Sequence, residues 1–319
     1  MTKKILFIAD DIAKFNLATD TTYLTMLTCY DMGIEVFYCT VKDLYVADGS
    51  KVFASVQNVE ILYSLDKLYT PNWYQIGTAQ KLDLVEFDTV LVRKDPPFDL
   101  EYYMMTQILS IAIQNGAKIF NHPDALRNYN EKLTTLQFPH LVVPSIVSKD
   151  KKRLLEFVEY NQDCIIKPLN MMAGAGVLKT NKEDSNLSVL LELSSQNFSQ
   201  TIIVQKFIPA VALGDRRVFI INGKVLDYCL VRIPANNSVR SNIAAGGTGV
   251  VEALTQETRE IAQEVADWAN NIMNLNFIGL DIIGGYLNEI NITSPTGLHQ
   301  IYKHTGVNGA ELWLKACLA

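Results

Sequence analysis

The chain has 319 residues, of which 49% are apolar and 19% are charged, and its formal net charge is −6 at pH 7. This length exceeds what a single hydrophobic core usually supports, so we expect two or three lobes. The acidic balance excludes a nucleic-acid-binding protein that relies on bulk positive potential, and any anion binding must depend on local basic clusters.

The first 121 residues alternate strand and helix patterns. Strands are predicted at residues 4–9, 34–39, 88–93 and 118–121, and helices at 19–31 and 102–115. This alternation predicts a parallel sheet. Residues 44–47 and 51–59 flank Asp48-Gly49 and predict a hairpin inserted into that pattern.

Two further segments follow. Residues 122–203 predict a second α/β unit, with helices at 148–161 and 187–193 and strands at 164–167 and 202–207. The last segment favours antiparallel pairing, because residues 216–221 and 225–233 flank Asn222-Gly223, which suits a two-residue hairpin turn. A long helix is predicted at 255–274 and a terminal helix at 308–317.

The cysteine pattern and the short apolar runs predict a cytoplasmic protein. No cysteine belongs to a CxxC motif: they are Cys29, Cys39, Cys164, Cys229 and Cys317. This scatter predicts reduced, buried thiols in a reducing compartment. The apolar run before Asp10 is too short for a signal peptide and indicates a first strand. No stretch is long enough to span a membrane, so we expect no membrane partner.

The stretch from residue 280 to 291 predicts a metal site. Gly284-Gly285 suits a two-residue hairpin turn, which places Asp281, Glu289 and Asn291 on neighbouring strands. Glu289 and Asn291 are two residues apart and therefore share one face of the sheet. Two carboxylates and an amide oxygen suit a hard cation such as Mg²⁺. The alternative is a polar strand face without a metal.

Two lysines and a glycine-containing segment predict anion binding. Lys132 lies at a predicted helix start, and Lys167 closes a buried strand, where it can serve as a point-charge ligand for phosphate. Residues 168–177, which include Gly174, can bring backbone N–H groups close to phosphate oxygens. The alternatives are solvated lysines and an ordinary β-turn.

Two loops and three arginines complete the candidate site. The strand end at residues 204–209 can offer backbone groups to an adenine edge, and the loop at 234–249, with Arg240 and Asn242, is a candidate lid. Arg93, Arg217 and Arg232 each adjoin an apolar strand, which suits bidentate binding of an anionic substrate. Structural ion pairs are the alternative for each arginine.

Several motifs occur in a distinctive order along the chain. They are Arg93-Lys94-Asp95-Pro96-Pro97-Phe98, Asn130-Glu131-Lys132, Ile166-Lys167-Pro168-Leu169, Gly214-Asp215-Arg216-Arg217-Val218, Arg232-Ile233-Pro234, Ala244-Ala245-Gly246-Gly247, Leu280-Asp281-Ile282-Ile283-Gly284 and Glu289-Ile290-Asn291-Ile292-Thr293-Ser294-Pro295-Thr296. In this order and spacing they closely resemble the bacterial glutathione synthetases of the ATP-grasp superfamily. The resemblance runs from residue 4 to beyond residue 300.

The resemblance implies an α/β ATP-grasp fold of three lobes. A Rossmann-like pre-ATP-grasp domain is expected at residues 1–121, a central lobe at 122–203, and a C-terminal lobe with the lid loop and metal site at 204–319. The implied reaction joins γ-glutamylcysteine and glycine with ATP as co-substrate and Mg²⁺ or Mn²⁺ as cofactor. The implied assembly is a homotetramer with no nucleic-acid partner.

The resemblance also implies residue roles. Nucleotide-binding residues would be Lys132, Lys167, Gly174, Gln205, Lys206, Phe207, Ile208 and Asp215; the metal ligands would be Asp281, Glu289 and Asn291; Arg93, Arg217 and Arg232 would bind the peptide; and Arg217, Arg240 and Asn242 would act in catalysis. From the sequence, Asp215 could equally pair only with its neighbours.

One departure from the family pattern falls in the phosphate-covering turn. The family's Asp-Gly-Met-Gly-Gly is replaced by Asn170-Met171-Met172-Ala173-Gly174. If the replaced glycines require positive φ, Met171 and Ala173 each carry a conformational cost of roughly 1 kcal/mol or more. The alternatives to a glutathione synthetase are therefore an ATP-grasp ligase with another donor or acceptor and an inactive nucleotide-binding homologue.

Overall fold

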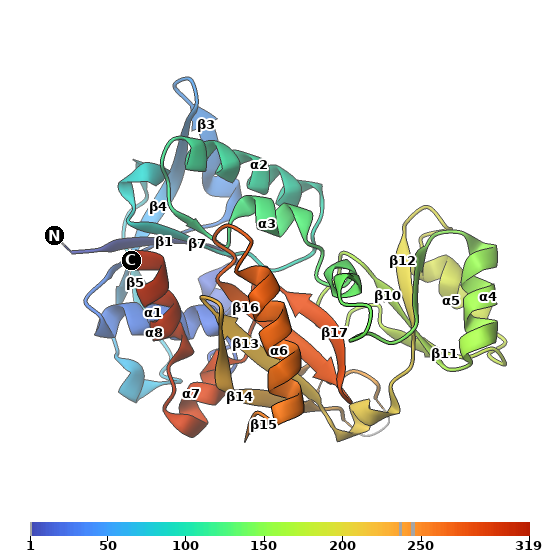
Figure 1. The fold of residues 1–319 in the computed structure, drawn as a ribbon. Helices are drawn as coiled ribbons and strands as arrows, with labels where there is room; N and C mark the ends of the chain where they lie inside the picture. The colour runs from blue at the N-terminus through green and yellow to red at the C-terminus, as the bar shows by residue number, and fades with distance from the viewer. Residues whose placement is uncertain (1, 236–237, 244–245) are drawn as a thin grey trace.

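The computed structural model describes residues 2–235, 238–243 and 246–319, and it contains three β-sheets in sequence order (Figure 1). Part of the predicted lid loop, including Ala244 and Ala245 of one motif, lies outside the described residues. No helix in the described part of the chain is long and apolar enough to cross a membrane.

The N-terminal sheet has a parallel centre, as predicted. β1 (Lys4–Ala9) lies between β2 (Glu35–Cys39) and β7 (Thr89–Arg93), and β8 (Ile119–Phe120) extends the sheet beyond β7. The hairpin of β3 (Leu44–Ala47) and β4 (Lys51–Ile61) and the short strands β5 (Tyr74–Ile76) and β6 (Gln80–Asp83) add antiparallel pairs. The helices of this region are α1 (Thr21–Asp31), α2 (Leu100–Gln114) and α3 (Pro123–Asn128). The apolar run of β1 is buried at all but its first residue, as expected for a central parallel strand.

The central lobe is a four-stranded antiparallel sheet in the order β11-β10-β12-β9. Its elements are β9 (Ser145–Ser148), α4 (Lys151–Asn161), β10 (Cys164–Pro168), β11 (Leu178–Thr180), α5 (Leu187–Ser194) and β12 (Ile202–Lys206). The two helices share a separate apolar core with β10 and β12, built around Leu154, Val158 and Leu191. The helix predicted from residue 148 begins later, because Asp150 caps it and the preceding residues pair as β9. The sheet ends at Lys206, so the expected boundary at 203/204 falls inside β12.

The C-terminal sheet has the order β15-β14-β13-β16-β17 and is antiparallel throughout. Its strands are β13 (Asp215–Ile221), β14 (Lys224–Ile233), β15 (Thr248–Ala253), β16 (Phe277–Ile283) and β17 (Tyr286–Asn291). Both predicted hairpin turns occur, with positive φ at Asn222 and Gly223 and at Gly284 and Gly285. β15 begins inside the segment predicted as the lid loop.

Helices connect this sheet to the rest of the molecule. They are α6 (Gln256–Ala269), α7 (Leu298–Thr305) and α8 (Gly309–Leu318). Short 3₁₀ helices occur elsewhere in the chain, at Ile12–Lys14, Val41–Asp43, Leu65–Lys67, Leu84–Glu86, Leu133–Gln137 and Pro209–Leu213. The prediction of one helix over 255–274 was too long, because the helix is capped at Asn270, and α7 was not predicted. α8 packs against α1, so the C-terminus returns to the N-terminal region (Figure 1).

The N-terminal and C-terminal sheets share continuous apolar cores. One cluster includes Leu6 and Val90 of the N-terminal sheet together with Val218 and Ile290 of the C-terminal sheet. Because these sheets share buried side chains, the β16–β17 hairpin is held on a rigid base. The central lobe keeps its own core and faces this base (Figure 1).

Candidate active site

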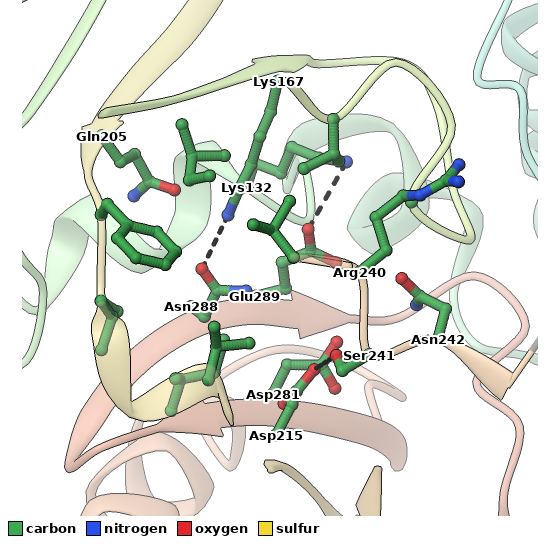
Figure 2. A pocket seen from close by; sticks show the side chains of 18 of the residues that line it. Lys132, Lys167, Gln205, Asp215, Arg240, Ser241, Asn242, Asp281, Asn288 and Glu289 are labelled. Carbon is green, nitrogen blue, oxygen red and sulfur yellow. Dashed lines mark hydrogen bonds and ion pairs between the residues drawn. The ribbon is translucent and has the colours of Figure 1, made fainter. Parts of the chain in front are cut away.

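The main cleft lies between the central lobe and the C-terminal sheet. Figure 2 shows Lys132 and Lys167 approaching Glu289 and Asn288 of β17, with Gln205 on one side and Arg240 and Asn242 on the other. These residues come from five separate stretches of the chain. The cleft therefore exists only once the two lobes face each other.

Two buried ammonium groups mark one region of the cleft. Lys132 is 5% exposed, and its Nζ donates to the carbonyl of Met171 at 2.7 Å and lies 3.9 Å from a Glu289 oxygen. Lys167 is 6% exposed and donates to Asn288 Oδ1 at 2.7 Å. Burial lowers the pKa of Lys167, and Glu289 acts in the opposite direction. Two cations in so small a space suit a polyphosphate, which supplies the negative charge that their desolvation requires.

The other side of the cleft suits a planar apolar ring. Its wall combines β12 and the following turn with side chains of neighbouring elements: Val143, Ile165, Val177, Phe207, Ile208 and Val211. The backbone N–H groups of Lys206 and Phe207 already donate to Pro144 and Asp163, at 2.9 Å each. The N–H of Ile208 has no partner among the described residues, so it is the donor that this turn can offer to a ligand.

The β16–β17 hairpin brings the predicted metal ligands together. Asp281 pairs in register with Glu289, and both line the cleft. The side-chain amide of Asn291 donates to the carbonyl of Gly279 at 3.1 Å, which orients its oxygen as the remaining ligand atom. No group of three or more His, Cys, Asp or Glu side chains that could hold a metal occurs in the described residues. A cation here would depend on two carboxylates and one amide oxygen, a donor set that fits Mg²⁺.

Asp281 also belongs to a buried ion-pair network with two arginines. Arg217 donates to both carboxylate oxygens, at 2.5 and 3.1 Å, and Arg232 approaches at 2.8 Å. Arg232 also pairs with Asp215 at 2.5 Å, and the hydroxyl of Ser241 donates to Asp215 at 2.8 Å. The ion-pair alternative for both arginines, and for Asp215, is therefore present in the structure.

The network sets the ionisation of both aspartates. Burial acts to raise the pKa of Asp281, but Arg217 and Arg232 outweigh it and hold that pKa below the ordinary range. Burial raises the pKa of Asp215 despite its contact with Arg232. With two guanidiniums and two carboxylates, the network is close to neutral.

A second cavity adjoins the cleft on the side of the N-terminal region. Arg217, Arg232 and Asn291 line it, and Asn242 and Ala173 line both spaces. The metal-ligand candidates therefore stand at the junction, with Asp281 and Glu289 in the cleft and Asn291 in the second cavity. A phosphate chain in the cleft and an acceptor group in the second cavity would meet at this hairpin.

Arg93 does not reach either space. Its side chain is 2% exposed, and it donates to Thr22 Oγ1 and to the carbonyl of Pro295, both at 3.0 Å. Its guanidinium also lies over the ring of Phe277, 5.3 Å from the centroid. Pro295 lines the second cavity, so Arg93 supports the wall of that cavity from behind.

The turn that was predicted to cover the phosphates is held by three successive carbonyls of its own, each of which accepts a hydrogen bond from another segment. Asn130 Nδ2 donates to Leu169, the N–H of Phe98 to Asn170, and Lys132 Nζ to Met171. The expected strain occurs at Ala173, whose φ is +53°, but not at Met171, which is absent from the positive-φ residues. A methionine is therefore tolerated at the first replaced glycine without left-handed backbone.

Gly174 lets the turn approach the lid loop. Its φ is +75°, and a Cβ there would lie 2.8 Å from Asn242 Oδ1 and 3.1 Å from Arg240 Cδ. Arg240 and Asn242 thus pack directly against the turn. The predicted lid residues and the predicted phosphate loop form one cover over the junction.

Two family models match the chain consecutively. The prokaryotic glutathione synthetase N-terminal domain matches residues 3–127, and the prokaryotic glutathione synthetase ATP-grasp domain matches residues 131–306. The chain belongs to the prokaryotic glutathione synthetase family. It is 39% identical over 313 residues to glutathione synthetase of Neisseria meningitidis serogroup A, covering 98% of both chains. It is 37% identical to glutathione synthetase of Ralstonia nicotianae, covering 98% of this chain and 94% of the relative.

Solved structures with low sequence identity share the fold. D-cycloserine synthetase DcsG gives a TM-score of 0.67 at 13% identity and covers 98% of both chains. The ATP-grasp ligase PsnB with a minimal precursor gives 0.62 at 16% identity, covering 99% of this chain and 98% of its own. The ATP-grasp fold and ATP-dependent ligase class of this glutathione synthetase family member agree with the sequence prediction.

Three residues of the site were not predicted from the sequence. Asn288 holds Lys167, Ser241 holds Asp215, and Glu131 Oε1 accepts from the N–H groups of Ile292 and Thr293 at 3.0 and 3.1 Å. Glu131 ties the segment of Lys132 to the end of β17. Its position beside Lys132 in a family motif was the available signal, whereas Asn288 and Ser241 carry no pattern of their own.

The cysteines take no part in this site. All five are free and buried, as predicted, and burial raises the pKa of Cys317 to about 12 and that of Cys164 to about 11. Thiols of this kind are poor nucleophiles near neutral pH.

Proposed function

We propose that the protein catalyses ATP-dependent formation of glutathione from γ-glutamylcysteine and glycine, with ADP and phosphate as the other products. The family match across both domains carries this proposal. The two adjoining spaces support it, because one suits a nucleotide and the other presents Arg217 and Arg232 to an anionic peptide. We assign the nucleotide contacts to Lys132, Lys167 and the turn after β12, which line the cleft.

The chemistry requires activation of a carboxylate. A peptide carboxylate is a poor electrophile because its leaving group would be an oxide, so the γ-phosphoryl group of ATP is first transferred to give an acyl phosphate. The glycine amine then attacks, and phosphate leaves from the tetrahedral intermediate. Lys132 and Lys167 neutralise the phosphate chain, and Arg217 and Arg240 stabilise charge on the transferred group.

We assign Mg²⁺, or Mn²⁺ in its place, to Asp281, Glu289 and the amide oxygen of Asn291. When bound, the cation would neutralise phosphate oxygens of ATP. In the protein alone, Arg217 and Arg232 occupy the Asp281 carboxylate, so this aspartate must share its oxygens between the guanidiniums and a cation. Asn291 needs no such exchange. Its amide nitrogen donates to the Gly279 carbonyl, which leaves the amide oxygen for a cation.

The cover over the junction excludes water. An acyl phosphate is readily hydrolysed, so it must form in a closed space. Arg240 and Asn242 would close over the turn at Ala173 and Gly174 and place a guanidinium beside the transferred phosphate. Asn242 would contribute an amide from the second-cavity side. We also propose that the protein is cytoplasmic and forms a homotetramer. Light scattering on the purified protein would test the tetramer, and cell fractionation would test the location.

The test is phosphate release from ATP with Mg²⁺, γ-glutamylcysteine and glycine, omitting each component in turn, with the product identified by mass. Release that requires every component and yields the tripeptide supports the proposal. Release that requires the dipeptide but is not increased by glycine indicates that the acyl phosphate forms and is hydrolysed by water, and that the acceptor is an amine other than glycine. Binding of ATP without any release indicates another donor or an inactive homologue.

A further inference from the structure

The second cavity has an acidic end opposite its arginines. Asp20 and Asp95, both from the N-terminal region, line it together with Asn16 and Gln300. Neither aspartate forms a salt bridge within residues 2–235, 238–243 and 246–319. The catalytic scheme above makes no use of either carboxylate.

Asp20 has one oxygen engaged and one available. As the cap of α1, its Oδ1 accepts from the N–H groups of Thr22 and Tyr23, at 2.6 and 3.0 Å. Both N–H groups use Oδ1, so Oδ2 keeps acceptor capacity toward the cavity that Asp20 lines, beside the Thr22 side chain. Helix capping therefore accounts for one of the two carboxylate oxygens of Asp20.

Asp95 is fixed by its backbone, and its carboxylate has a side-chain hydrogen bond with Ser294 but no salt bridge within the described residues. Its N–H donates to Asp10 at 2.9 Å, and its carbonyl accepts from Lys94 at 2.7 Å. The Lys94 ammonium pairs with Asp10, at 2.9 Å, and not with Asp95. Burial raises the pKa of Asp95 to about 6, and the carboxylates of Asp10 and Asp20 act in the same direction. Asp20 and Asp95 line the same cavity.

The local charge balance calls for one more cation. Arg217 and Arg232 are matched by Asp281 and Asp215. Arg93 is the cation that acts on Asp20 and Asp95, yet its hydrogen bonds go to Thr22 and Pro295. Lys14 and Glu131 also line the cavity, but Lys14 pairs with Asp11 at 3.6 Å and Glu131 accepts from Ile292 and Thr293. The carboxylates of Asp20 and Asp95 therefore share one guanidinium, which leaves one negative charge unmatched.

Gln300 adds a neutral acceptor to the same end of the cavity. Its Oε1 is buried and has no hydrogen-bond partner among the described residues. A buried, unpartnered acceptor is destabilising unless a ligand satisfies it. An ammonium group has three donors and suits a site with two carboxylates and an amide oxygen.

We propose that Asp20 and Asp95, assisted by Gln300, bind the α-ammonium group of the γ-glutamyl residue and thereby select donors that carry a free α-amine. This inference rests on the proposed function, since it assigns one end of the donor to one end of the second cavity. The donor then lies with its ammonium at the acidic end and its reacting carboxylate toward Arg217, Arg232 and the hairpin.

The experiment compares γ-glutamylcysteine with N-glutarylcysteine, which lacks only the α-amine. We expect the wild type to prefer γ-glutamylcysteine. Asp95→Asn should lower kcat/KM for γ-glutamylcysteine by about 10- to 100-fold, which is the size of effect expected for the loss of one charge-assisted hydrogen bond. It should change kcat/KM for N-glutarylcysteine little. Asp20→Asn should act likewise and keep the helix cap, because Asn caps as well as Asp. Asp31→Asn is the matched control, because Asp31 lies at the other end of α1 and does not line the cavity. The KM for ATP should be unchanged in all three variants.

Equilibrium binding of the two dipeptides with a non-hydrolysable ATP analogue separates this inference from the proposed function. A wild-type preference for the amine-bearing dipeptide that disappears in Asp95→Asn supports the inference, whether or not tripeptide is formed. Equal binding or no binding of the two dipeptides by the wild type, or a preference that survives in both cavity variants, overturns it. Failure of the wild type to form tripeptide overturns only the proposed function.

Discussion

Replacing Asp281 by Asn should destabilise the protein strongly, because it removes one charge from a buried, near-neutral network. Asp281 is 2% exposed and accepts three contacts of 2.5 to 3.1 Å from Arg217 and Arg232. Removing one partner of a buried ion pair typically costs about 3–5 kcal/mol, because the remaining charge is left uncompensated. Asn keeps the side-chain volume and one acceptor oxygen, so we expect the free energy of unfolding to fall by about 3 kcal/mol, near the lower end of this range.

The measurement is the calorimetric unfolding midpoint in the presence of a chelator. At the unfolding entropy typical per residue, about 3 kcal/mol corresponds to a fall of about 5 °C for a chain of this length. Asp227→Asn is the matched control, because Asp227 contacts Arg259 at 2.8 Å but is largely solvent-exposed. Exposed pairs contribute about 0–1 kcal/mol, so the control should change the midpoint by no more than about 1.5 °C.

A second variant tests whether charge is the cause. Asp281→Asn combined with Arg217→Met restores the balance of the network and should recover a large part of the lost midpoint. Equal, small shifts for Asp281→Asn and Asp227→Asn would refute the reasoning, since the network would then be screened as a surface pair is. Failure of the double variant to recover would show that packing, and not charge, dominates.

Three other perturbations have defined outcomes. Ala173→Gly should give a more stable protein than Ala175→Gly, by about 1 kcal/mol in denaturant unfolding, because of the two alanines Ala173 alone has positive φ. Equal stabilities of the two variants would contradict backbone strain at Ala173. His299→Phe should raise the thermal midpoint, because His299 is fully buried and neither ring nitrogen has a hydrogen-bond partner among the described residues. Burial lowers the pKa of His299 from 6.5 to about 4, so the wild type loses stability as the pH falls through this interval. The difference between the unfolding midpoints of variant and wild type should therefore widen from pH 8 to pH 5. A constant difference would contradict this. Lys167→Met should raise the KM for ATP by about 10-fold or more in the phosphate-release assay, and an unchanged KM would remove Lys167 from the phosphate contacts.

The sequence by itself determined the local features of this protein. Both hairpin turns were predictable, because Asn222-Gly223 and Gly284-Gly285 adopt positive φ for reasons internal to the dipeptide. The parallel centre of the first sheet followed from apolar runs alternating with helical patterns, a property of each short segment. The order of motifs identified the family, because this order can be read along the chain without knowing which segments come into contact in the fold.

Tertiary structure decided which charges face one another. Glu131 and Thr293 are 162 positions apart in the chain, and their contact depends on how the C-terminal sheet docks on the segment that leads into the central lobe. Arg93 adjoins an apolar strand just as Arg217 does, yet the packing of Phe277 and Pro295 turns it away from both cavities. Partner choice between distant groups depends on the shared core of two sheets, and a local pattern contains no information about that core.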